Sequence, residues 1–144
     1  MSLAEKPPSK HIWQESLTAA EKITQVRISP ITRVYLVHTI DQYMTDNSLC
    51  DHKPLGQQWL EAQTGMNDQV IQNIGDRCLI ISSIFPEKAS SRNTDNAFYC
   101  QIGQNAYRLL AKQSSQIQTR KVIFHELSTQ FLPIAHTLSY MRHN

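Results

Sequence analysis

The stretch NDQVIQNIGDRCLIISSIF, residues 67–85, decides the fold of this chain. The asparagine or aspartate at its start is a preferred helix N-cap, and Pro86, directly after it, disfavours helical geometry at the residue before. Its apolar residues cover about half of a helical circumference, and Leu79 and Ile80 add apolar surface elsewhere. We therefore predict a central helix over residues 67–85 whose C-terminal half is buried on more than one side.

Small residues indicate which helix crosses this central one. Glycine in a helix interior costs roughly 1 kcal/mol relative to alanine, so Gly75 indicates that another backbone approaches closely. A helix over residues 95–111, capped by Thr94, carries Gly103 and Ala106 in the middle of its apolar face. We predict a tight helix crossing at these two residues.

Helices are also predicted between residue 29 and the central helix. Ser29 followed by Pro30 is typical of a helix start, and the helix that runs from there to about residue 46 is apolar nearly all round. A shorter helix begins after Pro54, and Gly65 is placed to end it in a left-handed conformation.

Residues 87–93, between the central helix and the helix over residues 95–111, are polar and predict a loop.

The C-terminal part is predicted to form one long helix. A final helix begins at Thr119 and continues past Pro133, which removes one backbone hydrogen bond and should bend it.

The composition is typical of one all-α domain. The chain has 144 residues, of which 40% are hydrophobic and 18% charged, enough apolar material for a core. Only 4 glycines and 6 prolines are present, too few for the many turns of a β-sandwich. We predict a single bundle of five to six helices over residues 29–144, preceded by an N-terminal arm, residues 1–28, with a short helix over residues 16–26.

The charge and the cysteines of the chain limit the classes of function that it can have. The formal net charge of +2 is evenly spread, which argues against a nucleic-acid partner. The three cysteines Cys50, Cys78 and Cys100 form no CxxC pair and are typical of reduced thiols. The N-terminus lacks the apolar run of a signal peptide, and no stretch is long and apolar enough to span a membrane. These features predict a cytoplasmic protein with no membrane partner.

Several segments together resemble a family of uncharacterised, helical bacterial proteins. The most specific are the Gly-Asp step of the central helix and a Tyr-x-x-x-Gly-x-x-Ala-Tyr helix at residues 99–107. The resemblance spans about residues 31–132 and includes these stretches: YLV 35–37, KPL 53–55, IGDRCL 74–79, FPE 85–87, YCQIGQNAY 99–107 and FHEL 124–127. It implies an all-helical fold and a bacterial origin, and it implies no activity, cofactor or catalytic residue.

Asp76 is the most interesting charged residue, because it lies where a second layer of helices can cover the central helix. A covered carboxylate must be paired or hydrogen-bonded. The arginines available as partners are Arg33, Arg77, Arg92 and Arg108. A solvated or salt-bridged carboxylate, a ligand-facing or catalytic acid, and a contact across a dimer interface all remain open.

The sequence gives little support for a metal site or for a catalytic nucleophile. His38 and Asp41 share a helix face, but no second histidine–carboxylate pair is placed to complete a metal site. His125-Glu126 does not continue into HExxH, and no phosphate-binding or nucleophile-elbow motif occurs. Cys50, near His52, is the one candidate for a reactive thiol. We predict no metal and no cofactor.

Three hypotheses for function follow. The first is a non-enzymatic interaction or regulatory module that forms a homodimer, because the helix over residues 30–46 is more apolar than one small bundle covers. The second is a small-molecule binding or sensing domain, with a pocket between the central helix and the helix over residues 95–111. The third is an enzyme that uses Asp76 with His38 or Tyr99 as acid and base. The candidate ligand-binding residues are Asp76, Tyr99, Gly103, Tyr107 and His38.

Overall fold

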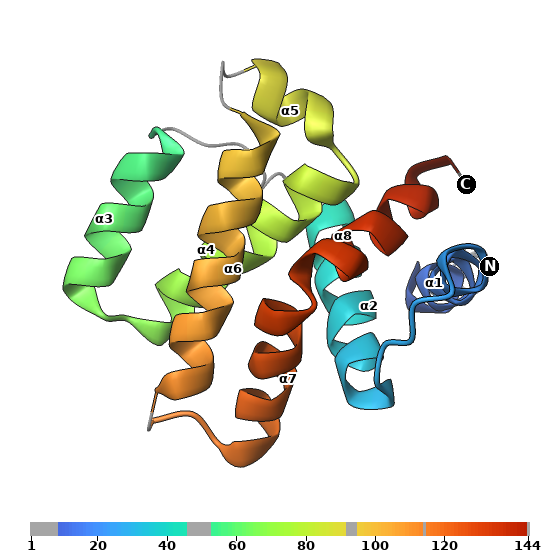
Figure 1. Cartoon of the computed structure of the whole chain (residues 1–144), viewed down its shortest axis with the longest axis horizontal. Coiled ribbons are helices and arrows are strands. Elements are labelled where there is room, and N and C mark those ends of the chain that lie inside the picture. Colours follow the sequence, from blue (N-terminus) through green and yellow to red (C-terminus); the bar gives the residue numbers. More distant parts are fainter. Residues whose placement is uncertain (1–8, 46–52, 92–94, 114, 144) are drawn as a thin grey trace, which may run out of the picture.

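A computed structural model describes residues 9–45, 53–91, 95–113 and 115–143. These residues form helices throughout and contain no strand, which confirms the all-α class. Figure 1 shows the helices packed against one another in a single body. They are α1 Ser9–Thr24, α2 Pro30–Thr45, α3 Leu55–Gly65, α4 Asp68–Ser83, α5 Pro86–Ser91, α6 Asn96–Lys112, α7 Gln118–Thr129, α8 Phe131–Ser139 and the short 3-10 helix η2 Tyr140–His143.

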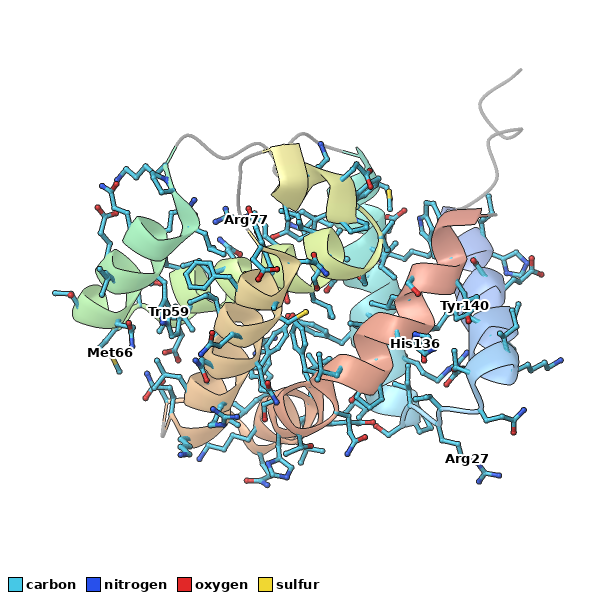
Figure 2. All side chains as sticks on the ribbon, turned by 45° about the horizontal axis from the view of Figure 1, so that its top comes forward. Arg27, Trp59, Met66, Arg77, His136 and Tyr140 are labelled. Carbon is cyan, nitrogen blue, oxygen red and sulfur yellow. The ribbon has the colours of Figure 1, made fainter. Side chains whose placement is uncertain are left out.

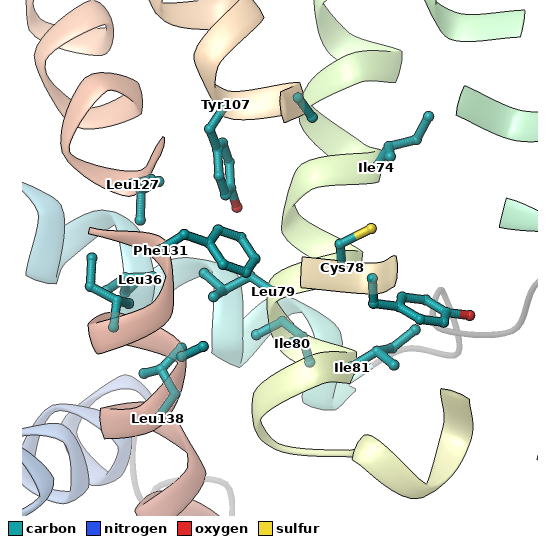
Figure 3. Close-up of a cluster of buried hydrophobic side chains, with 14 of the residues drawn as sticks. Leu36, Ile74, Cys78, Leu79, Ile80, Ile81, Tyr107, Leu127, Phe131 and Leu138 are labelled. Carbon is teal, nitrogen blue, oxygen red and sulfur yellow. The ribbon is translucent and has the colours of Figure 1, made fainter. Parts of the chain in front are cut away.

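The central helix is enclosed as predicted. α4 contacts α2, α3, α5, α6 and α8, and α6 crosses in front of it (Figure 1). Every residue from Cys78 to Ser83 is buried, which covers all sides of the last turns. Figure 3 shows Cys78, Leu79, Ile80 and Ile81 at the centre of this cluster. Asn67 caps the helix, because its side chain accepts a hydrogen bond from the backbone N–H of Val70 at 3.1 Å.

Two predicted helix ends are wrong by one residue. The αL residue after α3 is Met66, with φ 53° and ψ 34°, and its backbone N–H donates to the Ala62 carbonyl. Gly65 is still helical, so glycine is not the residue that reverses the chain. At α6, the side chain of Asp95 accepts from the N–H of Ala97 and caps the helix; Thr94 lies outside the described residues. In both cases a neighbouring residue satisfies the same terminal backbone groups.

The structure has eight α-helices in its described residues, whereas five to six were predicted. One addition is α5, Pro86–Ser91, in the segment predicted as a loop. Pro86 stops α4 and starts α5, since a fixed φ and a missing N–H suit a first helical residue. The side chain of Ala89 is fully buried, and this burial fixes the short helix against α4 and α6.

The other addition comes from the long C-terminal helix, which is divided rather than bent. α7 ends at Thr129, and Gln130, with φ −113° and ψ 24°, leaves helical geometry before α8 begins at Phe131. Pro133 therefore lies in the first turn of α8, where its missing N–H leaves no hydrogen bond unmade. The division allows Phe131 to turn into the core, where it is 1% exposed.

The N-terminal helix is longer than predicted. α1 begins at Ser9, not at residue 16, and it packs on α2 and α8. Leu17 and Ala20 are buried, and the Thr24 hydroxyl lies 2.9 Å from that of Thr137 on α8. Trp13, before the predicted start, is partly buried against the core and extends the buried face of the helix toward residue 9.

A carboxylate from α7 fixes the beginning of α2. Ser29 donates its backbone N–H to Oε2 of Glu126 at 3.0 Å and its hydroxyl to the same carboxylate, and Thr32 donates to Oε1 at 2.6 Å. Partial burial acts to raise the pKa of Glu126, but these hydrogen bonds outweigh it and lower the pKa. The predicted cap, Ser29, thus acts together with a residue distant in the sequence.

Candidate functional site

Asp76 lies in the middle of α4 and is held by two tyrosines. Its side chain accepts hydrogen bonds at Oδ1 from the Tyr35 hydroxyl on α2, at 2.7 Å, and from the Tyr107 hydroxyl on α6, at 2.6 Å. Asp76 itself is only 5% exposed. We call these three residues the tyrosine clamp. It ties α2, α4 and α6 together at the centre of the molecule.

The clamp continues toward α7 through polar side chains. Gln72 donates to the Tyr35 hydroxyl at 3.0 Å, and Arg120 donates to Oε1 of Gln72 at 2.5 Å. The guanidinium of Arg120 lies over the Phe124 ring, 5.2 Å from its centroid, and the same ring stacks on Tyr107. The positive charge of Arg120 is therefore linked to the buried acid through Gln72 and Tyr35.

The buried environment shifts all three titrating groups of the clamp. Burial raises the pKa of Asp76 to about 6, against the opposing effects of the hydrogen bonds from Tyr107 and Tyr35 and of the Arg120 charge. Burial and the adjacent Asp76 charge raise the pKa values of Tyr35 and Tyr107 above their ordinary range. The phenols consequently keep their protons and act as donors, and Asp76 titrates just below neutral pH.

The arginines considered as partners of Asp76 bind elsewhere. Arg33 pairs with Glu21, Arg77 donates to Gln58, and Arg108 donates to Asn105; Arg92 lies outside the described residues. Neutral phenols supply the hydrogen bonds that a buried carboxylate needs without taking a second charge out of water. One feature visible in the sequence points to Tyr35 as a partner: it lies on a helix that is apolar nearly all round, and a buried tyrosine hydroxyl requires a hydrogen-bond partner.

Aromatic rings lie against Gly75 in α4 and Gly103 in α6. A β-carbon on Gly75 would lie 3.0 Å from the Tyr107 ring, so a side chain rather than the predicted backbone approaches it. A β-carbon on Gly103 would lie 2.8 Å from the Phe131 ring and 2.9 Å from Cβ of Cys78, which agrees with the tight crossing predicted there. Tyr107, Phe131 and Cys78 appear together in Figure 3.

The remaining ligand candidates are dispersed. Tyr99 is buried in α6 and is 1% exposed. The hydrogen bonds described for Asp76 come from Tyr35 and Tyr107, not from Tyr99 or His38. His38 is exposed on α2 and lies on another surface, where α1 and α2 form a groove.

This α1–α2 groove has a volume of about 470 Å³. Its lining comes from Lys10 and Gln14 on α1 and from Pro30, Arg33, Val34, Val37 and His38 on α2. Val34 is 70% exposed, although it is aliphatic. The groove was not predicted from the sequence, because Lys10 and Gln14 were expected to lie in an N-terminal arm before the first helix. The signal available was the spacing of Trp13, Leu17 and Ala20, which continues one helical face back toward residue 9.

A second cavity, of about 460 Å³, lies between α3 and α4. Its floor is apolar, with Ala62, Val70 and Ile74 among its lining residues. Figure 2 shows α3, which carries Trp59 and is followed by Met66, at the edge of the molecule. The polar side chains around the cavity bind each other, since Lys53 donates to Glu61 at 3.0 Å and Arg77 donates to Gln58.

No three His, Cys, Asp or Glu side chains in the described ranges lie close enough together to hold a metal ion. His125 and His136 are exposed, and the His136 ring packs edge-on against Tyr140 (Figure 2). Cys78 is buried and Cys100 partly buried, whereas Cys50 and His52 lie outside the described residues. None of the helices described is both long and apolar enough to cross a lipid bilayer.

The fold and the site define an all-helical protein with a buried acid held by two tyrosines and a separate, open groove on its surface. Comparisons with protein-family models, with curated proteins and with solved structures gave no match to this chain.

Proposed function

We propose that this protein is a non-enzymatic binding module and that the α1–α2 groove is its binding surface. The observation that carries the proposal is the exposed aliphatic side chain of Val34 in a groove with Pro30 and Val37. Small-molecule and partner sites are typically concave and mostly apolar, with a few polar groups at defined places. The groove has this composition.

Polar groups at the groove are free to bind a ligand. Among the described residues, no hydrogen bond or ion pair engages the side chains of Lys10, Gln14 or His38. Arg33 differs, because its guanidinium pairs with Glu21 and donates to Thr18 at 2.7 Å. A bound molecule would thus gain contacts from three side chains without breaking any bond within the protein.

The interior supports a preformed groove. α2, one wall of the groove, is fixed at its start by Glu126 and in its middle by the hydrogen bond from Tyr35 to Asp76. α1, the other wall, is fixed by its buried Leu17 and by the contact between Thr24 and Thr137. A wall that does not move on binding reduces the entropy cost of association.

The test is binding of an uncharged, solvatochromic dye such as Nile red. Val34→Asp places a charge in the groove and should abolish the dye's fluorescence increase, and its surface position should leave stability within about 0.5 kcal/mol. Val122→Asp is the matched control, because Val122 is 46% exposed on α7. Equal dye binding by the wild type and both variants would overturn the proposal.

A second candidate function is self-association through the same helix. Ile31 and Val34 are 39% and 70% exposed and lie three residues apart on α2, so they share one face. Light scattering at micromolar concentration should then show a dimer, which Val34→Asp converts to a monomer. A monomeric wild type would exclude the homodimer at that concentration and leave the groove open to another ligand.

A further inference from the structure

We propose that the α1–α2 groove binds a small apolar acid, of the kind represented by a medium-chain fatty acid, with the carboxylate beside Lys10 and the chain along Val34 and Val37. This proposal rests on the binding function proposed above and names the ligand class.

The size of the groove favours a small, elongated molecule over a partner helix. Its volume of about 470 Å³ falls within the range of small-molecule sites. The α2 wall runs from Pro30 to His38, which is about 12 Å at 1.5 Å per residue. A wall of this length offers about two helical turns, which suits one alkyl chain.

The charge of the lining favours an anion. The ionisable residues of the groove are Lys10, Arg33 and His38, and no carboxylate is among its lining residues. Glu21 neutralises Arg33, so the unpaired positive charge in the groove belongs to Lys10. A cation in an apolar groove attracts a carboxylate and disfavours a ligand with a positive head.

The two walls of the groove differ in polarity. A short connection joins α1 to α2, and the two helices cross, since Figure 1 shows α1 nearly end-on where α2 lies in the plane of the view. Arg33 donates to Thr18, and Lys10 and Gln14 lie further toward the start of α1. Lys10 and Gln14 supply polar side chains from the α1 wall, and Pro30, Val34 and Val37 supply the apolar part of the α2 wall. The methylene stem of Lys10 can itself cover part of an alkyl chain.

The experiment compares three ligands with the same chain: decanoate, decanol and decyltrimethylammonium, each titrated calorimetrically below its micelle concentration. Decanoate should bind most tightly and the cation most weakly. Lys10→Glu should weaken decanoate by about five-fold or more, which is what a single exposed ion pair is worth, and should leave decanol unchanged. Lys112→Glu, at an exposed lysine near the end of α6, is the matched control and should change neither.

Val34→Asp separates failure of the ligand class from failure of the site. If decanol binds as tightly as decanoate and Val34→Asp blocks both, the groove binds apolar molecules and the proposed preference for an acid is wrong. If none of the three ligands binds, or if Val34→Asp leaves all binding unchanged, the groove is not the binding surface and both proposals fail. Val122→Asp should leave every affinity as in the wild type.

Discussion

Asp76 shows how a carboxylate can be buried without a cation in contact with it. Two phenol hydrogen bonds reach one oxygen of Asp76, and Arg120 is linked to it through Gln72 and Tyr35. Hydrogen bonds to a charged acceptor are roughly twice as strong as those between neutral groups. They do not fully compensate for burial, because the pKa of Asp76 is raised and not lowered.

Asp76→Asn should stabilise the protein near neutral pH and leave its stability unchanged near pH 4. The folded pKa of about 6 exceeds the ordinary 3.8, so the folded state binds the proton more tightly. The wild type therefore loses stability as the pH rises from about 4 to about 6, by an amount on the order of 2–3 kcal/mol. Asparagine keeps an acceptor oxygen for Tyr35 and Tyr107 and does not titrate.

Urea unfolding of both proteins at about pH 4 and about pH 7.5 measures this difference. Glu87→Gln, at an exposed carboxylate on α5, controls for the general effect of removing one negative charge. An Asp76→Asn variant that unfolds at a lower urea concentration than the wild type at neutral pH would show that the charged carboxylate is itself stabilising.

At the scale of elements, the crossing of α4 and α6 depends on one missing side chain. Gly103→Ala would place a methyl group 2.9 Å from Cβ of Cys78, an atom that moves only with its backbone. Such overpacking costs about 1–3 kcal/mol, of which the better helix propensity of alanine returns about 1 kcal/mol. We therefore expect a net loss of stability.

Gly65→Ala is the matched control for this prediction. Gly65 is helical and exposed, and a β-carbon there would meet no atom within 4 Å. Alanine should stabilise the protein by about 0.4–1 kcal/mol through the unfolded state. Chemical unfolding of the two variants should thus give changes of opposite sign, and a stabilised Gly103→Ala protein would contradict the crossing seen here.

Helix identities were more predictable than helix ends. The segments of α4 and α6 follow from their apolar spacing, because that spacing is local and repeats over several turns, and α2 follows from its Ser29-Pro30 start. The ends of α3 and α6 and the short α5 differ from prediction, since adjacent residues such as Gly65 and Met66 compete for the same capping position. The break at Gln130 lies three residues before Pro133 and directly before the buried Phe131.

At the scale of the whole molecule, α1 belongs to the packed body. Leu17 has 0% exposure and lies in the main core cluster. Leu17→Ala should therefore reduce the free energy of unfolding by about 2–5 kcal/mol, as expected for a buried leucine. Ile23→Ala on the same helix, at a side chain 60% exposed, should change it by less than about 0.5 kcal/mol. Equal, small effects in urea unfolding would show that α1 is a loose arm in solution.

The amino-acid sequence by itself determined the all-α class, the position of the central helix, the faces that are buried and the close crossing at Gly103. A helix is held by hydrogen bonds between residues close in sequence, and its buried face repeats with a period of a few residues. Both the helix and its buried face can therefore be predicted from a short segment of sequence. Only the tertiary structure decided that Asp76 meets Tyr35 and Tyr107, which lie 41 and 31 residues away, and that α1 forms a groove with α2. Such pairings depend on how whole helices pack. No local pattern specifies which of several side chains distant in the sequence will contact a given residue.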